Sequence, residues 1–281
     1  MNNSSILIIG KNGKTGLRVE RRLQAQGYAT RAVSRSTTPA FDWENPATWR
    51  AAISGTRSAY VTFHPDLAIP AAEQRIREFV ALAAEVGIEH IVLLSGRGEE
   101  GAQRAEAILQ SSGLHWNVVR ASWFMQNFSE SFMIEGILDG ELLLPAGDIA
   151  EPFIDADDIA DVAVAALTRA ELRNRLFEVT GPRALTFADC VGEIAAATGY
   201  PVKFTSIPVE GFIGALRAQG VPADVQWLMR ELFTVVFDGR NSKPVSGVED
   251  ALGRPATDFS EFVRKVQRSG AWKRSGMLKQ A

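Results

Sequence analysis

Short apolar runs alternate with helix-like segments through roughly the first 120 residues, and this alternation constrains the fold more than any other feature. Runs such as Ile6-Leu7-Ile8-Ile9 have the composition of buried strands, and strands separated by helices build βαβ units with right-handed crossovers. We therefore expect an α/β fold: a Rossmann-type doubly wound parallel sheet. The expected strands are residues 5–10, 28–35, 58–63, 90–96 and 115–121, and the expected helices are 14–27, 46–55, 71–87 and 102–113.

The alternation of strand-like and helix-like segments becomes less regular after residue 121, where an aromatic and Met-rich segment precedes further strand and helix patterns. Thr186 is expected to cap a helix that ends at Gly199. We expect an NAD(P)-binding domain over residues 1–150, with later returns of the chain at about 151–180 and 200–207. A smaller C-terminal α/β substrate lobe is expected mainly over residues 181–281.

Composition narrows the class of protein. The 281 residues are 46% hydrophobic and 22% charged, as in an ordinary globular protein, and the net charge of -3 gives no basic footprint for nucleic acid. The lone Cys190 excludes an internal disulfide framework and a cysteine-based zinc site. No apolar run has the length of a signal peptide core or a membrane span. We expect a cytoplasmic monomer or homodimer with a small-molecule substrate, no metal, no nucleic-acid partner and no membrane association.

Three glycines directly follow the first apolar run, at positions Gly10, Gly13 and Gly16. The spacing is G-x-x-G-x-x-G, which differs from the G-x-G-x-x-G dinucleotide fingerprint. At a strand-to-helix junction, unpaired N–H groups and the helix dipole favour an anion, and glycines let the backbone approach a pyrophosphate. The alternative is a plain strand-to-helix turn. Further expected cofactor-binding donors in this loop are Lys11, Asn12, Lys14 and Thr15.

The end of the second expected strand bears on which dinucleotide binds. An acidic residue there marks NAD, and an arginine accommodates the 2′-phosphate of NADP. This chain has Ser34, Arg35 and Ser36 and no acid at that place. The pattern favours NADP(H), with NAD(H) possible.

Two later strand ends are expected to border the cofactor, because ligands of doubly wound sheets bind beyond the carboxyl ends of the strands. His64 is the candidate catalytic residue there, with a structural role as the alternative; no catalytic residue is otherwise assigned. The expected cofactor-binding residues at these ends are Thr62, Phe63, His64, Ser95, Gly96 and Arg97.

An aromatic segment follows the fifth expected strand and is expected to line the substrate pocket. Trp123 is the strongest candidate because it follows the strand end closely, whereas rings at helical spacing are also typical of a core. Asp155, Asp157 and Asp158 are expected in the N-cap and first turn of a helix. The expected substrate-binding residues are Trp123, Phe124, Met125, Asn127, Phe128 and Phe153.

With these motifs, the chain resembles the NmrA-like branch of the atypical short-chain dehydrogenases. "GKNGKTG" stands at that family's GxxGxxG motif, and residues 105–128 resemble its "ExxLxxSGL" helix and "LRPxxFMxN" stretch, with Ala121 in place of the proline. The segments 152–168, 177–199 and 251–263 resemble its later parts. "FDWENPATW" and "WFMQNF" look most like the ergot-alkaloid reductases of the festuclavine synthase/agroclavine dehydrogenase type and their bacterial relatives.

The resemblance implies NADPH-dependent reduction of a cyclic imine or iminium. Alternatives within the same branch are a quinone or azo-type oxidoreductase and a non-catalytic sensor of the NADP(H) redox state. The Tyr-x-x-x-Lys pair that protonates a ketone in typical members is absent, since no lysine lies four residues after Tyr28, Tyr60 or Tyr200. Ala102 occupies the place where relatives often have a Lys or His. Hydride addition to an iminium needs no proton donor, so the missing acid is compatible with this reaction.

Overall fold

A six-stranded parallel sheet forms the centre of the first part of the chain in the computed structural model, which describes residues 5–274. The strand order is β2-β1-β3-β4-β5-β7, so the chain winds outward from β1 in both directions. This order confirms the predicted doubly wound fold. The strands are β1 (Ile6–Ile9), β2 (Thr30–Val33), β3 (Ser58–Val61), β4 (His90–Gly96), β5 (His115–Ala121) and β7 (Arg175–Val179).

The central strands are apolar because both of their faces are covered. All four residues of β1 are buried, and Ile6 aligns with Thr30 of β2 and with Ser58 of β3. Since the strands are parallel and in this register, their carboxyl ends meet at one edge of the sheet. The sequence-predicted cofactor residues lie at these ends or directly after them.

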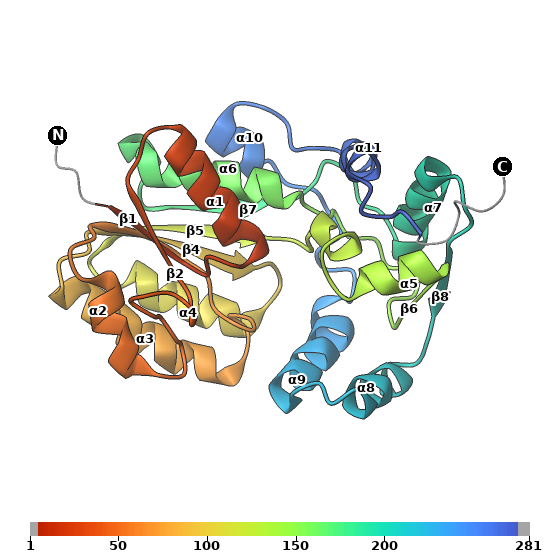
Figure 1. Cartoon of the computed structure of the whole chain (residues 1–281), viewed down its shortest axis with the longest axis horizontal. Helices are drawn as coiled ribbons and strands as arrows, with labels where there is room; N and C mark the ends of the chain where they lie inside the picture. The colour runs from red at the N-terminus through yellow and green to blue at the C-terminus, as the bar shows by residue number, and fades with distance from the viewer. Residues whose placement is uncertain (1–4, 275–281) are drawn as a thin grey trace. The chain divides into compact units, whose positions relative to one another are not determined.

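Helices cover both faces of this sheet (Figure 1). On one face α1 packs on α6, and α6 packs on α10; on the other face α2 and α4 both pack on α3. The six helices are α1 (Lys14–Ala25), α2 (Trp49–Ile53), α3 (Pro70–Glu85), α4 (Glu100–Gln110), α6 (Ala156–Thr168) and α10 (Gly247–Leu252).

The chain divides into two compact units. Among the described residues, the first comprises 5–121, 156–179 and 246–255, and the second 122–155, 180–245 and 256–274. These limits differ from the expected ones, because residues 122–150 leave the sheet after β5. The expected later return at 200–207 is also part of the second unit, where β8 (Lys203–Ser206) pairs with β6 (Glu141–Leu144) in a separate parallel sheet.

An aromatic core holds the second unit together. It gathers rings from segments far apart in sequence, including Phe128, Phe153, Phe187, Phe259 and Phe262. Thr186 caps α7 as predicted: its hydroxyl accepts from the Asp189 N–H at 3.0 Å. The helices of this unit are α5 (Met133–Asp139), α7 (Phe187–Thr198), α8 (Val209–Ala218), α9 (Ala223–Glu231) and α11 (Phe259–Ser269).

Short helical turns complete the chain. They are η1 (Pro46–Thr48), η2 (Met125–Phe128), η3 (Ala170–Leu172) and the π-helical η4 (Leu232–Val236). None of the helices within residues 5–274 combines the length and the hydropathy that a membrane crossing requires.

Candidate active site

The loop between β1 and α1 is built from backbone contacts that only glycine permits. Gly10 has a φ of +94°, in the left-handed region, and a Cβ there would lie 2.1 Å from Thr62 Oγ1. A Cβ on Gly16 would lie 2.2 Å from the Gly10 carbonyl oxygen, so the first turn of α1 touches the loop directly. At Gly13 the same contact would be 3.2 Å, which is tight rather than forbidden. Gly10 thus allows the loop to lie against the Thr62 side chain, and Gly16 allows the first turn of α1 to lie against the loop backbone.

The amino end of α1 suits a bound anion. Its N-cap residue is Gly13, so no side chain caps the helix, and its first turn contains no acidic residue. The positive end of the helix dipole and the first N–H groups therefore face no carboxylate of their own helix. A dinucleotide diphosphate fits this cradle, with Lys11, Asn12, Lys14 and Thr15 as the side chains around it.

The loop after β2 lies beside the glycine loop. Asn12 Nδ2 donates to Ser34 Oγ at 3.5 Å, and Ser34 Oγ is 3.1 Å from Ser36 Oγ. Arg35 between them is exposed, and its guanidinium makes no hydrogen bond or ion pair with any residue in the range 5–274. Two hydroxyls and an uncommitted guanidinium are what a 2′-phosphate requires.

The end of β3 supports the glycine loop from the other side. Thr62 Oγ1 donates to the Ile9 carbonyl at 3.0 Å, and the Thr62 carbonyl accepts from Trp43 Nε1 at 3.0 Å. The Trp43 ring lies 4.7 Å from that of Phe63, centroid to centroid. His64 follows on the surface and is exposed. Trp43 was missed as a supporting residue, although it stands within the "FDWENPATW" motif quoted above.

At the ends of β4, β5 and β7, charged side chains bind one another. Arg97 Nε lies 2.7 Å from Glu178 Oε1, and Arg120 Nη2 lies 2.5 Å from Glu106 Oε2. Arg120 also reaches Glu178 at 3.3 Å, and Ser95 Oγ donates to Glu106 Oε1 at 2.5 Å. The hydrogen bonds that Arg120 donates to Glu106 are the largest influence that raises the pKa of Arg120. Two of the predicted cofactor residues, Ser95 and Arg97, are therefore fixed by partners that the sequence reasoning did not include.

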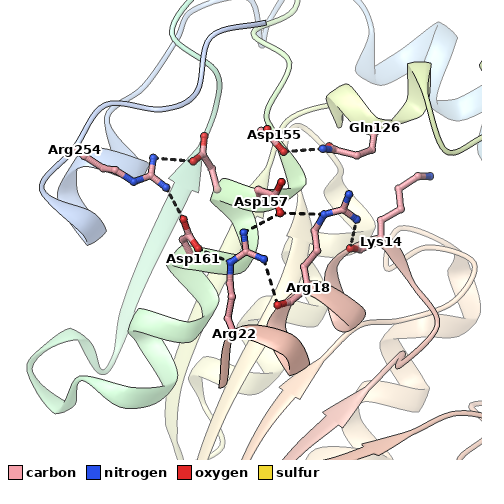
Figure 2. A network of polar contacts seen from close by, with 9 residues as sticks. Lys14, Arg18, Arg22, Gln126, Asp155, Asp157, Asp161 and Arg254 are labelled. Atoms are coloured by element: carbon pink, nitrogen blue, oxygen red, sulfur yellow. Dashed lines mark hydrogen bonds and ion pairs between the residues drawn. The ribbon is translucent and has the colours of Figure 1, made fainter. Parts of the chain in front are cut away.

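The acidic residues near the start of α6 are paired rather than free (Figure 2). Asp157 Oδ1 lies 3.2 Å from Arg18 Nε and 2.8 Å from Arg22 Nη2, both on α1. Asp158, nearly fully buried, lies 2.8 Å from Arg254. Within the second unit, Asp155 accepts a hydrogen bond from Gln126 at 2.6 Å. Asp157 and Asp158 occupy the first turn of α6, as expected, and the pairs of Asp157 with Arg18 and Arg22 fix α1, which begins at the glycine loop.

In the second unit, the predicted substrate residues fall into two groups. Trp123 is partly buried, with its ring 5.1 to 5.8 Å from those of Phe187, Phe233 and Phe237. Phe124 and Asn127 are also partly exposed. The other three pack inside the aromatic core of this unit, and they are Met125, Phe128 and Phe153. Only the first group has side-chain surface to offer a ligand.

No family model matches the chain. It is, however, 30% identical to the NAD(P)H azoreductase of Xenophilus azovorans, in an alignment that covers 92% of this chain and 96% of that protein. The chain belongs to the NmrA-like atypical short-chain dehydrogenase/reductase family. It is also 28% identical to the agroclavine dehydrogenase of Claviceps fusiformis, with coverage of 92% and 96%.

The solved structures agree on the fold. The NADPH complex of an Escherichia coli NADPH-dependent quinone oxidoreductase superposes with a TM-score of 0.78 at 18% identity, covering 93% of this chain and 99% of that one. Together the relatives confirm three predictions: the family, an enzyme of the NAD(P)H-dependent oxidoreductase class, and NADP(H) as the cofactor, with NAD(H) possible.

Proposed function

We propose that this family member is an NADPH-dependent reductase that delivers hydride to a small electron-poor acceptor, best a cyclic imine or iminium. The observation that carries the cofactor choice is the exposed Arg35 between two serines, beside the cradle formed by the glycine loop. A guanidinium there favours a 2′-phosphate, and no carboxylate competes for a ribose hydroxyl.

The proposed division of work follows from the chemistry of each group. The first unit would hold the dinucleotide through the glycine loop, Ser34, Arg35, Ser36 and the residues after β3. When bound, the nicotinamide cofactor supplies a hydride equivalent. Trp123 would offer an aromatic face to a flat or cationic acceptor, with Phe124 and Asn127 at its side.

The missing Tyr-Lys pair supports an acceptor that needs no proton in the hydride step. Adding hydride to a ketone creates an alkoxide, which general-acid catalysis would stabilise. Adding hydride to an iminium carbon cancels a positive charge and yields a neutral amine. For such an acceptor the protein has only to exclude water and align the reacting atoms.

An azo or quinone acceptor is the second candidate. It is favoured by the 30% identity to a relative named as an azoreductase. A non-catalytic NADP(H) sensor is the third candidate function, and any catalytic turnover of NADPH would exclude this candidate. A cytoplasmic location, a monomeric or homodimeric state and the lack of a nucleic-acid partner are parts of the proposal.

The deciding experiment is a paired titration of NADPH and NADH against the wild type and Arg35→Ala, followed by tryptophan fluorescence. Loss of a charge-assisted pair of hydrogen bonds is worth about 1.5–3 kcal/mol. We therefore expect NADPH binding to weaken roughly 10- to 100-fold and NADH binding to stay unchanged. Arg21→Ala, which removes an exposed arginine of α1, is the matched control.

Equal effects of Arg35→Ala on both cofactors would contradict the assignment of Arg35. If neither cofactor binds the wild type, the glycine loop is only a turn. An acceptor panel of a cyclic iminium, a menadione-like quinone and an azo dye, scored by NADPH consumption, then separates the candidate reactions.

A further inference from the structure

Asn12 and Gly13 form the single Asn–Gly pair of the chain, and the pair lies in the glycine loop. Both residues are exposed, so solvent water reaches them. In an Asn–Gly pair the backbone nitrogen of the glycine attacks the side-chain amide carbon of the asparagine with little obstruction, because glycine has no Cβ and a permissive backbone. The pair therefore has the chemistry of a deamidation site, which the proposed reduction does not use.

The nitrogen of Gly13 lies outside the hydrogen-bond ladder of α1. Gly13 is the N-cap residue, with an extended backbone (φ of -79° and ψ of 162°). Its N–H donates within the loop, to the Gly10 carbonyl at 2.9 Å, whereas its own carbonyl accepts from the Leu17 N–H at 3.2 Å. Opening the turn from Gly10 to Gly13 thus frees the nitrogen while α1 stays formed.

The side chain of Asn12 is held loosely. Its Nδ2 lies 3.5 Å from Ser34 Oγ, which is long for a hydrogen bond between an amide and a hydroxyl. Since the side chain is exposed, it can rotate from Ser34 toward the Gly13 nitrogen through solvent.

The electrostatics of the loop favour this attack. Negative charge develops on the Gly13 nitrogen and then on the amide oxygen of Asn12. The positive end of the α1 dipole lies here, and the first turn of α1 contains no acidic residue. Lys11 and Lys14 flank the pair in sequence, and Arg35 follows Ser34 in the adjoining loop. A cradle that suits a diphosphate also stabilises an anionic intermediate.

We propose that Asn12 is a deamidation site and that its conversion lowers the affinity for NADPH. The Gly13 nitrogen forms a bond to Cγ of Asn12, the bond from Cγ to Nδ2 breaks, and ammonia leaves with the proton of the Gly13 nitrogen. Solvent water then opens the cyclic imide at either carbonyl, which leaves aspartate or isoaspartate at position 12. No oxidant or reductant takes part. The effect on affinity rests on the proposed function, which puts NADPH at this loop.

The two products would damage the cofactor site in different ways. An aspartate places a carboxylate beside Ser34, next to the Arg35 assigned to the 2′-phosphate. This carboxylate repels the phosphate and competes with it for the guanidinium. An isoaspartate adds a methylene to the backbone of a loop in which Gly10 and Gly16 leave no room for a Cβ. The first product changes the charge of the site, and the second changes the path of the loop.

The first measurement is peptide mapping by mass spectrometry on the folded protein, kept for increasing times in mildly alkaline buffer. We expect conversion at Asn12, while Asn174, which is exposed but precedes Arg175, stays an amide. Gly13→Ala is the diagnostic variant, since its backbone is extended and the new Cβ would lie 3.2 Å from the Gly10 carbonyl oxygen. This variant should retain Asn12. Conversion no faster at Asn12 than at Asn174, or as fast in Gly13→Ala as in the wild type, would overturn the proposal.

The second measurement compares the dissociation constants of NADPH and NADH for the wild type and Asn12→Asp. We expect NADPH binding to weaken roughly tenfold or more and NADH binding to weaken less, because NADH has no 2′-phosphate to repel. Asn12→Ala loses the amide without gaining a charge, and it should weaken NADPH binding less than Asn12→Asp. Equal effects of the two variants on NADPH, or of Asn12→Asp on the two cofactors, would overturn the role of the new charge.

The third measurement repeats the peptide mapping with saturating NADPH. We expect slower conversion of Asn12, because a bound cofactor covers the loop and holds it closed. An unchanged rate would overturn the link between Asn12 and the cofactor. If the fresh wild type binds neither cofactor and Asn12 still converts, the deamidation site is supported and the proposed function is refuted instead.

Discussion

The two units hold their candidate residues by different means. In the first unit, the glycine loop is fixed by close contacts that leave no room for a Cβ, and the ends of β4, β5 and β7 are fixed by ion pairs with Glu178 and the buried Glu106. In the second unit, Trp123 is held by the rings of Phe187, Phe233 and Phe237. Backbone contacts and buried charges tolerate little change, whereas ring packing can accommodate related side chains. The cofactor side should therefore be rigidly specified and the acceptor side adaptable.

Glu106→Ala should give the largest effect, because Glu106 is 2% exposed and holds both Arg120 and Ser95. Removing one partner of a buried ion pair costs about 3–5 kcal/mol. The measurement is the free energy of unfolding in urea. Glu210→Ala, the control, removes the exposed partner of Arg230 in the second unit and should change the free energy of unfolding little. Equal losses would break the contrast between the units.

Gly16→Ala should come second, because its new Cβ would lie 2.2 Å from the Gly10 carbonyl oxygen. Overpacking of this kind costs about 1–3 kcal/mol, and the displaced loop should also lose NADPH affinity. Gly192→Ala in α7 is the matched change in the second unit, where a Cβ meets nothing within 4 Å. That variant should gain roughly 0.5–1 kcal/mol from helix propensity. A Gly16→Ala protein that binds NADPH normally would remove the steric account of the loop.

Trp123→Phe should give the smallest change in stability, about 1 kcal/mol, since a phenyl ring can keep part of the edge contacts. The expected signature is a raised KM for aromatic acceptors with NADPH affinity unchanged. Trp227→Phe, which alters an exposed tryptophan of α9, is the control. It should change neither the stability nor the KM for aromatic acceptors. An unchanged KM for Trp123→Phe would take Trp123 out of the proposed acceptor site.

Much of the first unit could be predicted from local sequence. The apolar runs and their spacing identify the strands from β1 to β5, and Gly10 and Gly16 stand where the structure leaves no room for a Cβ. These features are readable because each depends on residues near one another in the chain.

The partners of the charged residues could not be predicted in this way. Glu178 pairs with Arg97 and Arg120, from which it is separated by 81 and 58 positions in the sequence. Nothing in the local sequence therefore indicates these ion pairs. The same holds for β6 and β8, which form their own sheet although 203–206 reads like a return to the main one. Met125, Phe128 and Phe153 show a further limit, since an aromatic pattern looks alike in a pocket and in a core.

The connectivity of the two units has a consequence for how the protein is made. The chain passes between the units five times, and the first unit includes residues 246–255. During synthesis, domains generally fold as they emerge, starting from the amino end. Here the ribosome must deliver almost the entire polypeptide before either unit has all of its parts. The last strand of the main sheet, β7, ends only at Val179 and the last helix of the first unit, α10, only at Leu252, so this unit stays incomplete for most of translation and its exposure to chaperones is correspondingly long.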